Sequence, residues 1–160
     1  MATEKLKFKL ELYATMWDKP PIAEVLINDK SQFKGEITVS KENSQFIEFE
    51  AELDEGKEYS LVIKRSNKTD PQTVVNDKGD IIHDQLLHIA NIEIDDIDIG
   101  SLIYEGVYSP EYPEPWATQQ RQEGHSLPET VKNSPIMGHN GIWKFSFTSP
   151  FYMWLLENLY

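Results

Sequence analysis

The segment between residues 67 and 84 gathers side chains whose oxygen atoms could bind a cation. The candidate ligands are Asn67, Asp70, Asp77, Asp80 and Asp84. Calcium takes roughly six to eight oxygen ligands, which Asp carboxylates and Asn carbonyls supply. The same residue types also build plain turns, because their side chains bond to nearby backbone groups. The residues alone therefore leave two interpretations open, a calcium site and an acidic turn region.

Residues 58–99 contain, in order, a strand, a loop rich in Asn and Asp, the segment Asp84-Gln85-Leu86-Leu87-His88-Ile89 and an Ile-rich strand. This part of the chain resembles the calcium-dependent xylan-binding modules. Modules of that family are small β-sandwiches, in which an Asn-Asp loop and an Asp-Arg-Asn-Leu-type segment build a metal site that contacts sugar hydroxyls. The resemblance implies that Asp84 is one metal ligand and that Asn67 or Asn76-Asp77 belongs to the first loop. Gln85-Leu86 stands where the family has Arg-Asn, so the ligand set differs there.

Four aromatic residues lie in or near expected loops, namely Trp17, Tyr108, Tyr112 and Trp116. Flat rings stack on the C–H faces of pyranoses, and Tyr and Trp keep a polar edge as well. Residues 108–116 would form an exposed aromatic strip if this segment were extended, and would then bind carbohydrate. The alternative is that these rings pin a long loop to a sheet, because large aromatic side chains are mostly buried.

A third pattern, Glu93-Ile94-Asp95-Asp96-Ile97-Asp98, resembles the Glu-x-Asp-x-x-Glu signature of laminarinase-type β-glucanases. The resemblance implies Glu93 as nucleophile, Asp95 as its helper and Asp98 as acid/base. In a regular strand Asp98 would face away from Glu93, so a bulge would be needed to bring them together. An acidic turn after an Ile-rich strand accounts for the same residues, and we expect no enzyme.

Composition narrows the classes of partner. The chain has 160 residues, a net charge of −12 and no cysteine. Nucleic-acid binding needs a concentrated basic surface, so it is not expected, and an anionic membrane is disfavoured too. Neutral sugars and cations remain suitable partners. The first residues lack the apolar core of a signal peptide, and no apolar run reaches the ~18–20 residues of a membrane helix. We therefore expect a soluble protein that is made in the cytoplasm, follows a route without a cleaved signal, or is carried in a virion; these residues do not choose among the three.

Alternating apolar residues predict strands over most of the first hundred residues. They are expected over residues 6–12, 22–27, 33–39, 46–53, 59–63 and 86–94, with a further strand over 142–148. The turn at 54–57 predicts a hairpin. The apolar phase shifts between Leu87/Ile89 and Ile92/Ile94, which indicates a bulge or burial on both faces. Such a series predicts a mainly β fold, an antiparallel β-sandwich of jelly-roll type, as one domain over residues 1–160.

Two further segments complete the expected architecture. Residues 101–141 are rich in Pro and Gly and predict a long irregular insertion, in which only 114–122 suits a short helix. A C-terminal helix is expected over 149–158, with Ser149 as N-cap and Pro150 in the first helical position. Residues 151–156 of that helix are apolar all round, so it must be buried in the domain or in a partner.

These observations support three hypotheses of function. The first is a non-enzymatic carbohydrate-binding module, with calcium as the candidate cofactor. The second is a structural or assembly protein of a virus or phage particle, which forms oligomers through its apolar C-terminal segment. The third is a laminarinase-like glycoside hydrolase.

Overall fold

The computed structural model describes residues 2–17, 19–68, 74–78 and 80–158. Two main sheets contain most of its strands. The first sheet contains β1 (Thr3–Thr15), β4 (Gln45–Asp54), β8 (Leu86–Ile94), β9 (Ile97–Asp98) and β12 (Ile136–Met137). The second contains β2 (Ile22–Ile27), β3 (Lys30–Glu36), β5 (Glu58–Ser66), β10 (Val107–Pro110), β11 (Val131–Lys132) and β13 (Gly141–Thr148). The remaining elements are the β6 (Val74–Val75) and β7 (Ile81–His83) pair, two 3-10 helices (Lys41–Asn43 and Gly100–Glu105), α1 (Trp116–Gln122) and α2 (Phe151–Asn158).

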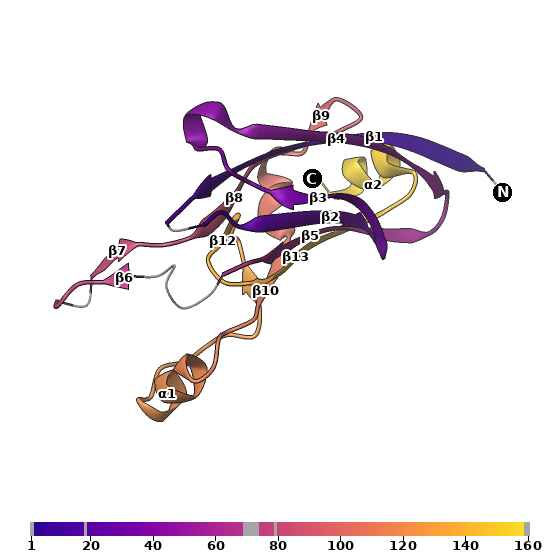
Figure 1. Cartoon of the computed structure of the whole chain (residues 1–160). Coiled ribbons are helices and arrows are strands. Elements are labelled where there is room, and N and C mark those ends of the chain that lie inside the picture. The colour runs from indigo at the N-terminus through magenta and orange to yellow at the C-terminus, as the bar shows by residue number, and fades with distance from the viewer. Residues whose placement is uncertain (1, 18, 69–73, 79, 159–160) are drawn as a thin grey trace.

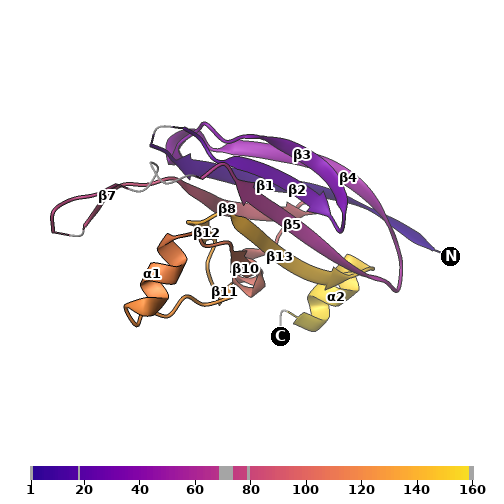
Figure 2. The same ribbon diagram turned by 60° about the horizontal axis from the view of Figure 1, so that its bottom comes forward.

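The two sheets lie face to face, which confirms the predicted antiparallel β-sandwich (Figure 1). The strand order is β12-β8-β1-β4 in the first sheet, with β9 paired to β8, and β11-β10-β13-β5-β2-β3 in the second. The β6–β7 hairpin and α1 extend beyond the sandwich at one end, while α2 lies toward the other (Figures 1 and 2). Among the described residues, no helix is long and apolar enough to span a bilayer.

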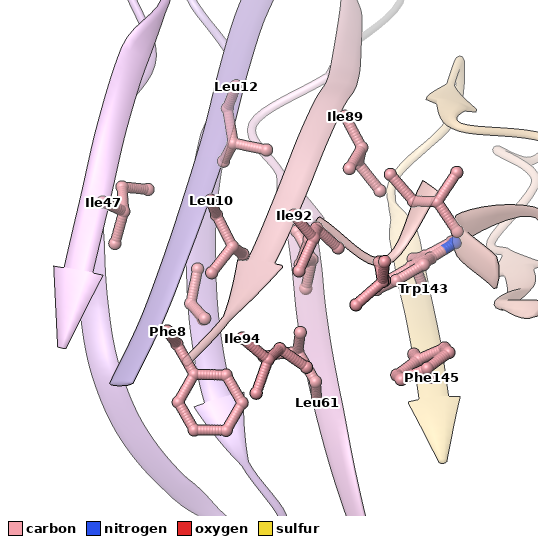
Figure 3. Close-up of a cluster of buried hydrophobic side chains, with 14 of the residues drawn as sticks. Phe8, Leu10, Leu12, Ile47, Leu61, Ile89, Ile92, Ile94, Trp143 and Phe145 are labelled. Atoms are coloured by element: carbon pink, nitrogen blue, oxygen red, sulfur yellow. The ribbon is translucent and has the colours of Figure 1, made fainter. Parts of the chain in front are cut away.

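Apolar alternation places the core between the sheets. On β1, Leu6, Phe8, Leu10 and Leu12 are almost fully buried, and β13 supplies Trp143, Phe145 and Phe147 from the facing sheet. Figure 3 shows side chains of β1, β4 and β8 directed toward those of β5 and β13. Successive strand residues point to opposite faces, so a period of two buries one face of each strand. Each fully buried aliphatic or aromatic side chain stabilises the fold by about 1.5–3 kcal/mol.

The predicted irregularity in the strand over 86–94 is a β-bulge. Glu11 of β1 pairs with Asn91 of β8, whereas the next residue, Leu12, pairs with Ile89. Ala90 is therefore the extra residue, and it is exposed. The bulge restores the apolar phase, so that both Ile89 and Ile92 face the core.

The hairpin predicted at residues 54–57 is wrong. β4 pairs with β1 in the first sheet, and β5 pairs with β2 and β13 in the second, so this turn crosses from one sheet to the other. The turn bonds instead to the connection before α2: Gly56 N donates to Ser149 O at 2.8 Å, and Ser149 N donates to Lys57 O at 3.0 Å. Turn residues mark a reversal of the chain, but they do not select the sheet that the next strand joins.

Residues 101–141 are less irregular than predicted. β10 and β11 extend the second sheet beside β13, and β12 extends the first sheet beside β8. These strands have two to four residues each, too few for alternation to reveal them. The helix expected within 114–122 is present as α1. The third strand, β3, begins and ends three residues earlier than the predicted 33–39.

α2 forms within the predicted 149–158, but it is capped differently. Ser149 Oγ donates to Glu4 Oε2 at 2.6 Å, and the same carboxylate accepts from Phe151 N at 3.0 Å. Glu4 of β1 therefore satisfies the first helical N–H in place of Ser149. Phe151 and Leu155 are buried, while Tyr152, Met153 and Leu156 are exposed. Within this chain, then, only one face of the apolar helix is covered.

Candidate functional site

Four connections meet at the end of the sandwich that carries α1 and the β6–β7 hairpin (Figures 1 and 2). They are the link from β1 to β2, the residues after β5, the link from β7 to β8 and the link from β12 to β13. We call this region the loop end. Its hydrogen-bonding residues are Lys19, Pro20, Arg65, Asn67, Lys68, Asp84, Gln85, Gly138, His139 and Asn140.

Asn140 joins the β12–β13 link to the residues after β5. Its side-chain oxygen accepts hydrogen bonds from Lys68 N at 2.9 Å and from Arg65 Nη1 at 2.9 Å. Its amide nitrogen donates to Lys68 O at 3.0 Å. Both backbone polar groups of Lys68 are therefore satisfied by one side chain, which fixes the start of the Lys68 side chain.

Gln85 joins the other two connections. Its amide nitrogen donates to Lys19 O at 2.9 Å and to Asn67 O at 3.2 Å, and its own carbonyl accepts from Arg65 Nη2 at 2.5 Å. Arg65 is only 1% exposed. Burial lowers the pKa of Arg65 to about 10, so the guanidinium is still charged at neutral pH. Asn140 Oδ1 and the backbone oxygen of Gln85 accept from its two terminal nitrogens, which offsets part of the cost of burying this charge, while the buried Nε has no hydrogen-bond partner among the described residues.

Lys68 and Asp84 form an ion pair inside this network. Lys68 Nζ lies 2.9 Å from Asp84 Oδ1, and it also donates to Gly138 O at 2.5 Å. The two side chains are 13% and 18% exposed. Asp84 Oδ1 accepts a further hydrogen bond from Gln85 N at 2.8 Å. The pair therefore links three of the connections at the loop end.

An aromatic cluster of Tyr112, Trp116 and His139 lies beside the ion pair. The His139 ring is 5.0 Å from the Tyr112 ring and 5.6 Å from the Trp116 ring, centroid to centroid. Burial, helped by the nearby Lys68 ammonium, lowers the pKa of His139 to about 4, so at neutral pH its ring is uncharged. Trp116 is 36% exposed. The cluster thus offers solvent an indole backed by two further rings.

A second ring pair lies at the same end. The Trp17 indole stacks flat on His83 of β7, with 3.8 Å between ring centroids and 8° between ring planes. Trp17 is 43% exposed, so the indole edge and part of its surface face solvent. Each of the two exposed indoles of the loop end is therefore backed by a histidine ring.

An open hollow of about 320 Å³ adjoins the aromatic cluster. Tyr112 lines it together with Arg121 of α1, Glu114 and Glu129. Tyr112 Oη donates to Pro128 O at 2.6 Å, so this hydrogen bond joins the segment before α1 to the segment after it. An aromatic wall with a few polar side chains is a common lining for small-molecule sites.

Two solved structures with a similar fold are carbohydrate-binding modules. One is vCBM60 in complex with galactobiose, which has a TM-score of 0.50 and 8% identity and covers 87% of this chain and 96% of the module. Another form of vCBM60, described with a circular permutation that links two families of calcium-dependent carbohydrate-binding modules, has a TM-score of 0.50 and 7% identity, over 88% of this chain and 89% of that one. This chain shares their fold. No protein-family model matches the sequence, and no curated protein matches it either.

The aromatic residues predicted to bind sugar separate into two groups. Trp17, Tyr112 and Trp116 lie at the surface of the loop end, whereas Tyr108 is buried at 4% exposure. The prediction that Tyr108 begins an exposed aromatic strip is therefore wrong. Tyr108 faces inward on β10 because that strand joins β13, and its hydroxyl bonds to the backbone of His139. Burial raises the pKa of Tyr108 to about 12.

The predicted calcium ligands do not converge in the described part of the chain. Asn67 turns its amide nitrogen to Pro20 O at 2.8 Å, and the Asp84 carboxylate pairs with Lys68. Asp77 and Asp80 are exposed in the β6–β7 turn, which Asn76 closes by accepting from Lys78 N and Asp80 N. Asp70 lies outside the described residues. Residues 2–17, 19–68, 74–78 and 80–158 hold no group of three His, Cys, Asp or Glu suited to a metal.

The acidic residues of the third pattern form a tight hairpin between β8 and β9. Asp95 and Asp96 have φ values of 54° and 63°, and Asp95 Oδ1 accepts from Lys7 N at 3.0 Å. Glu93 pairs directly with Asp98 across the hairpin, lies 3.9 Å from Lys9 and faces the outside of the sheet. No bulge is needed to bring Glu93 and Asp98 to one face, because the turn does so. These contacts are those of an exposed acidic turn.

Several residues of the loop end were not predicted, chiefly Arg65, Lys68, Gln85, His139 and Asn140. The position of Arg65 could have been recognised from the sequence. Leu61, Ile63 and Arg65 are alternate residues of β5, so Arg65 falls on the strand face that is otherwise apolar. The other four could not have been recognised in this way, because each acts through a partner that is distant in the sequence.

Proposed function

We propose that this chain is a non-enzymatic carbohydrate-binding module that holds its sugar at the loop end. The carrying observation is the exposed Trp116 indole, backed by Tyr112 and an uncharged His139, beside a polar network on a fold shared with carbohydrate-binding modules. The module in complex with galactobiose shows that this architecture supports sugar binding in another protein.

The chemistry of the loop end suits a neutral sugar. A pyranose would stack its C–H face on the exposed Trp116 indole. The adjoining hollow, which Tyr112 lines and Trp116 does not, offers Arg121 and Glu129 to the hydroxyl groups of a neighbouring sugar unit. Trp17 supplies a second indole for a longer chain. A net charge of −12 does not repel an uncharged ligand.

Calcium is not part of this proposal. Among the described candidate ligands, Asn67 donates its amide nitrogen to Pro20 O and Asp84 pairs with Lys68, while Asp77 and Asp80 are exposed in the β6–β7 turn. The calcium dependence predicted from residues 67–84 is therefore a separate question, and calcium enters the experiments below as a variable.

The test is the binding of galactobiose, galactan and xylan, measured by calorimetry for the disaccharide and by affinity electrophoresis for the polymers. Trp116→Ala should weaken binding at least about 10-fold, which corresponds to about 1.4 kcal/mol. Trp116→Phe should recover part of the loss, because it retains a flat ring. Trp17→Ala should weaken the polymers more than the disaccharide, if both indoles contact one chain.

The matched control is Tyr152→Ala, which removes an exposed ring of α2 at the other end of the molecule. It should bind as the wild type does. Equal binding by the wild type and Trp116→Ala would place the sugar elsewhere. No binding of any of the three carbohydrates by the wild type would contradict the proposal.

One observation favours the alternative of an assembly protein. Tyr152, Met153 and Leu156 form an exposed apolar face on α2, and such a face suits a contact with another chain. The fold comparisons give no support to a phage origin. Light scattering at several protein concentrations tests self-association directly, and a monomer at every concentration would exclude assembly through this face.

A further inference from the structure

We propose that the Lys68 ammonium group is the built-in cation of the loop end, so that the connections are held together, and sugar is bound, without a metal ion. The part of this inference that concerns sugar rests on the proposed function. The part that concerns how the connections of the loop end are held together depends only on the contacts of Lys68.

The Lys68 ammonium has the surroundings that a hard cation would seek. It lies 2.9 Å from a carboxylate oxygen of Asp84 and donates to the Gly138 carbonyl oxygen at 2.5 Å. Carboxylate and backbone carbonyl oxygens are also the ligands of calcium in proteins. An ammonium is a compact charge with three donors, so it suits the same oxygen atoms.

The position of this ammonium is determined by the backbone around it. Asn140 bonds to both the N–H and the C=O of Lys68. The preceding residue, Asn67, has a φ of 78° and bonds through its side chain to Pro20 O. Asn tolerates this left-handed conformation better than most residues. The start of the Lys68 side chain is therefore held from both sides, which lowers the entropy lost when its end pairs with Asp84.

The charges of the loop end disfavour an added divalent ion. Two cations, Arg65 and Lys68, share the region with the carboxylate of Asp84, and Arg65 is 1% exposed. A calcium ion bound to Asp84 would have to displace Lys68 or lie next to its positive charge. Like charges at such short range repel strongly where little water screens them. Among the described residues of the loop end, Asp84 is therefore paired with a lysine and lies near a buried arginine.

The first experiment is the thermal unfolding of the full wild-type chain in EDTA and again in millimolar calcium. We expect the same Tm in both, because a ligand that binds the native state must raise the Tm. A Tm that rises with calcium, saturably and more than with an equal ionic strength of sodium chloride, would overturn the inference.

The second experiment is a double-mutant cycle in EDTA with Lys68→Met and Asp84→Asn. Lys68→Met removes the charge but retains most of the stem, and it should lower the Tm by about 5–10 °C because the Asp84 carboxylate, whose side chain is 18% exposed, loses the ammonium group at 2.9 Å. Asp84→Asn retains the acceptor for Gln85 N. The double variant should be no less stable than Lys68→Met, because the carboxylate charge that Lys68 balances is removed as well.

Lys144→Met is the matched control, because Lys144 is exposed on β13, and its Tm should equal that of the wild type. The inference is wrong if the losses of the two single variants simply add, or if Lys68→Met melts like Lys144→Met. Should Lys68→Met fail to fold, the Tm of the wild type in EDTA and in calcium still tests the inference.

Galactan and xylan binding in EDTA and in calcium separates this inference from the proposed function. Equal affinity in EDTA and in calcium supports the proposed function and the built-in cation alike. Binding only in calcium overturns the built-in cation while the module assignment stands. If the chain binds neither polymer in EDTA nor in calcium, the proposed function is wrong. The thermal measurements then test the role of Lys68 on their own.

Discussion

The two ends of this sandwich are stabilised by different kinds of contact. Around α2, aromatic rings meet edge to face: Phe147 and Phe151 are 5.5 Å apart, as are Phe145 and Trp154. At the loop end, Arg65 and Lys68 bond instead to carbonyl, amide and carboxylate oxygens. The first kind of contact removes apolar surface from water and involves no charged group. The second depends on every partner being present, because each polar group that loses its partner is left desolvated.

This difference matters for function because a binding site needs polar and aromatic groups at fixed positions. The α2 end offers an exposed apolar face, whereas the loop end offers two exposed indoles that are each backed by a histidine. The polar network holds the connections that carry those rings. Four predictions test the contrast, and they are given from the largest expected effect to the smallest.

The largest loss should come from the apolar end. Phe147→Ala should lower the free energy of unfolding by about 3–5 kcal/mol, because it leaves a cavity among rings that cannot close it. Phe147 is 1% exposed and contacts five other aromatic rings. Urea unfolding at low and high salt measures the effect, which should be equal in both. A loss that changes strongly with salt would contradict a purely apolar contact.

Asn140→Ala should lower the free energy of unfolding by about 2–3 kcal/mol, because it removes the hydrogen-bond partners of Lys68 N, Lys68 O and Arg65 Nη1. The same urea titration measures it, with the exposed Gln119→Ala of α1 as the control. Unlike Phe147→Ala, this variant should also weaken sugar binding, since it loosens the link that carries His139. A stable Asn140→Ala with unchanged binding would show that the network is dispensable.

Stability should fall as the pH is lowered from about 6.5 toward 4. The pKa of His139 is lowered to about 4 by burial, and the pKa of His88 is also lowered by burial. In this window the unfolded chain binds protons on these histidines that the folded chain does not, so acid favours unfolding. His139→Phe should flatten the dependence, measured as urea midpoints across the window, and the exposed His125→Phe should not. An unchanged slope in His139→Phe would argue against a neutral, partly buried His139.

The smallest effect should come from the outer face of α2. Met153→Ser replaces a 60% exposed side chain, and should change the free energy of unfolding by less than about 0.5 kcal/mol. Chemical unfolding of the dilute monomer measures this. A larger loss, growing with protein concentration, would instead indicate that the α2 face is covered by another copy.

Much of the sandwich was predictable because its signals are local. β2 and β8 have the predicted bounds, and α2 lies within the predicted 149–158. The bulge near Ala90 followed from a shift in apolar phase. Alternation with a period of two reports which face of a strand is buried, whatever the rest of the chain does. The aromatic residues Trp17, Tyr112 and Trp116 were singled out by type, and they do lie at one end.

The sheet that each strand joins, and the partners of each charge, were decided by tertiary structure. β5 leaves the turn after β4 for the other sheet, and Tyr108 turns inward because β10 meets β13. Lys68 finds Asp84 and Gly138, and Arg65 finds Asn140, across separations that no local pattern spans. The sequence by itself determined which faces are apolar and where the chain turns. Only the packing of the two sheets brought Lys68 to within 2.9 Å of Asp84 at the loop end.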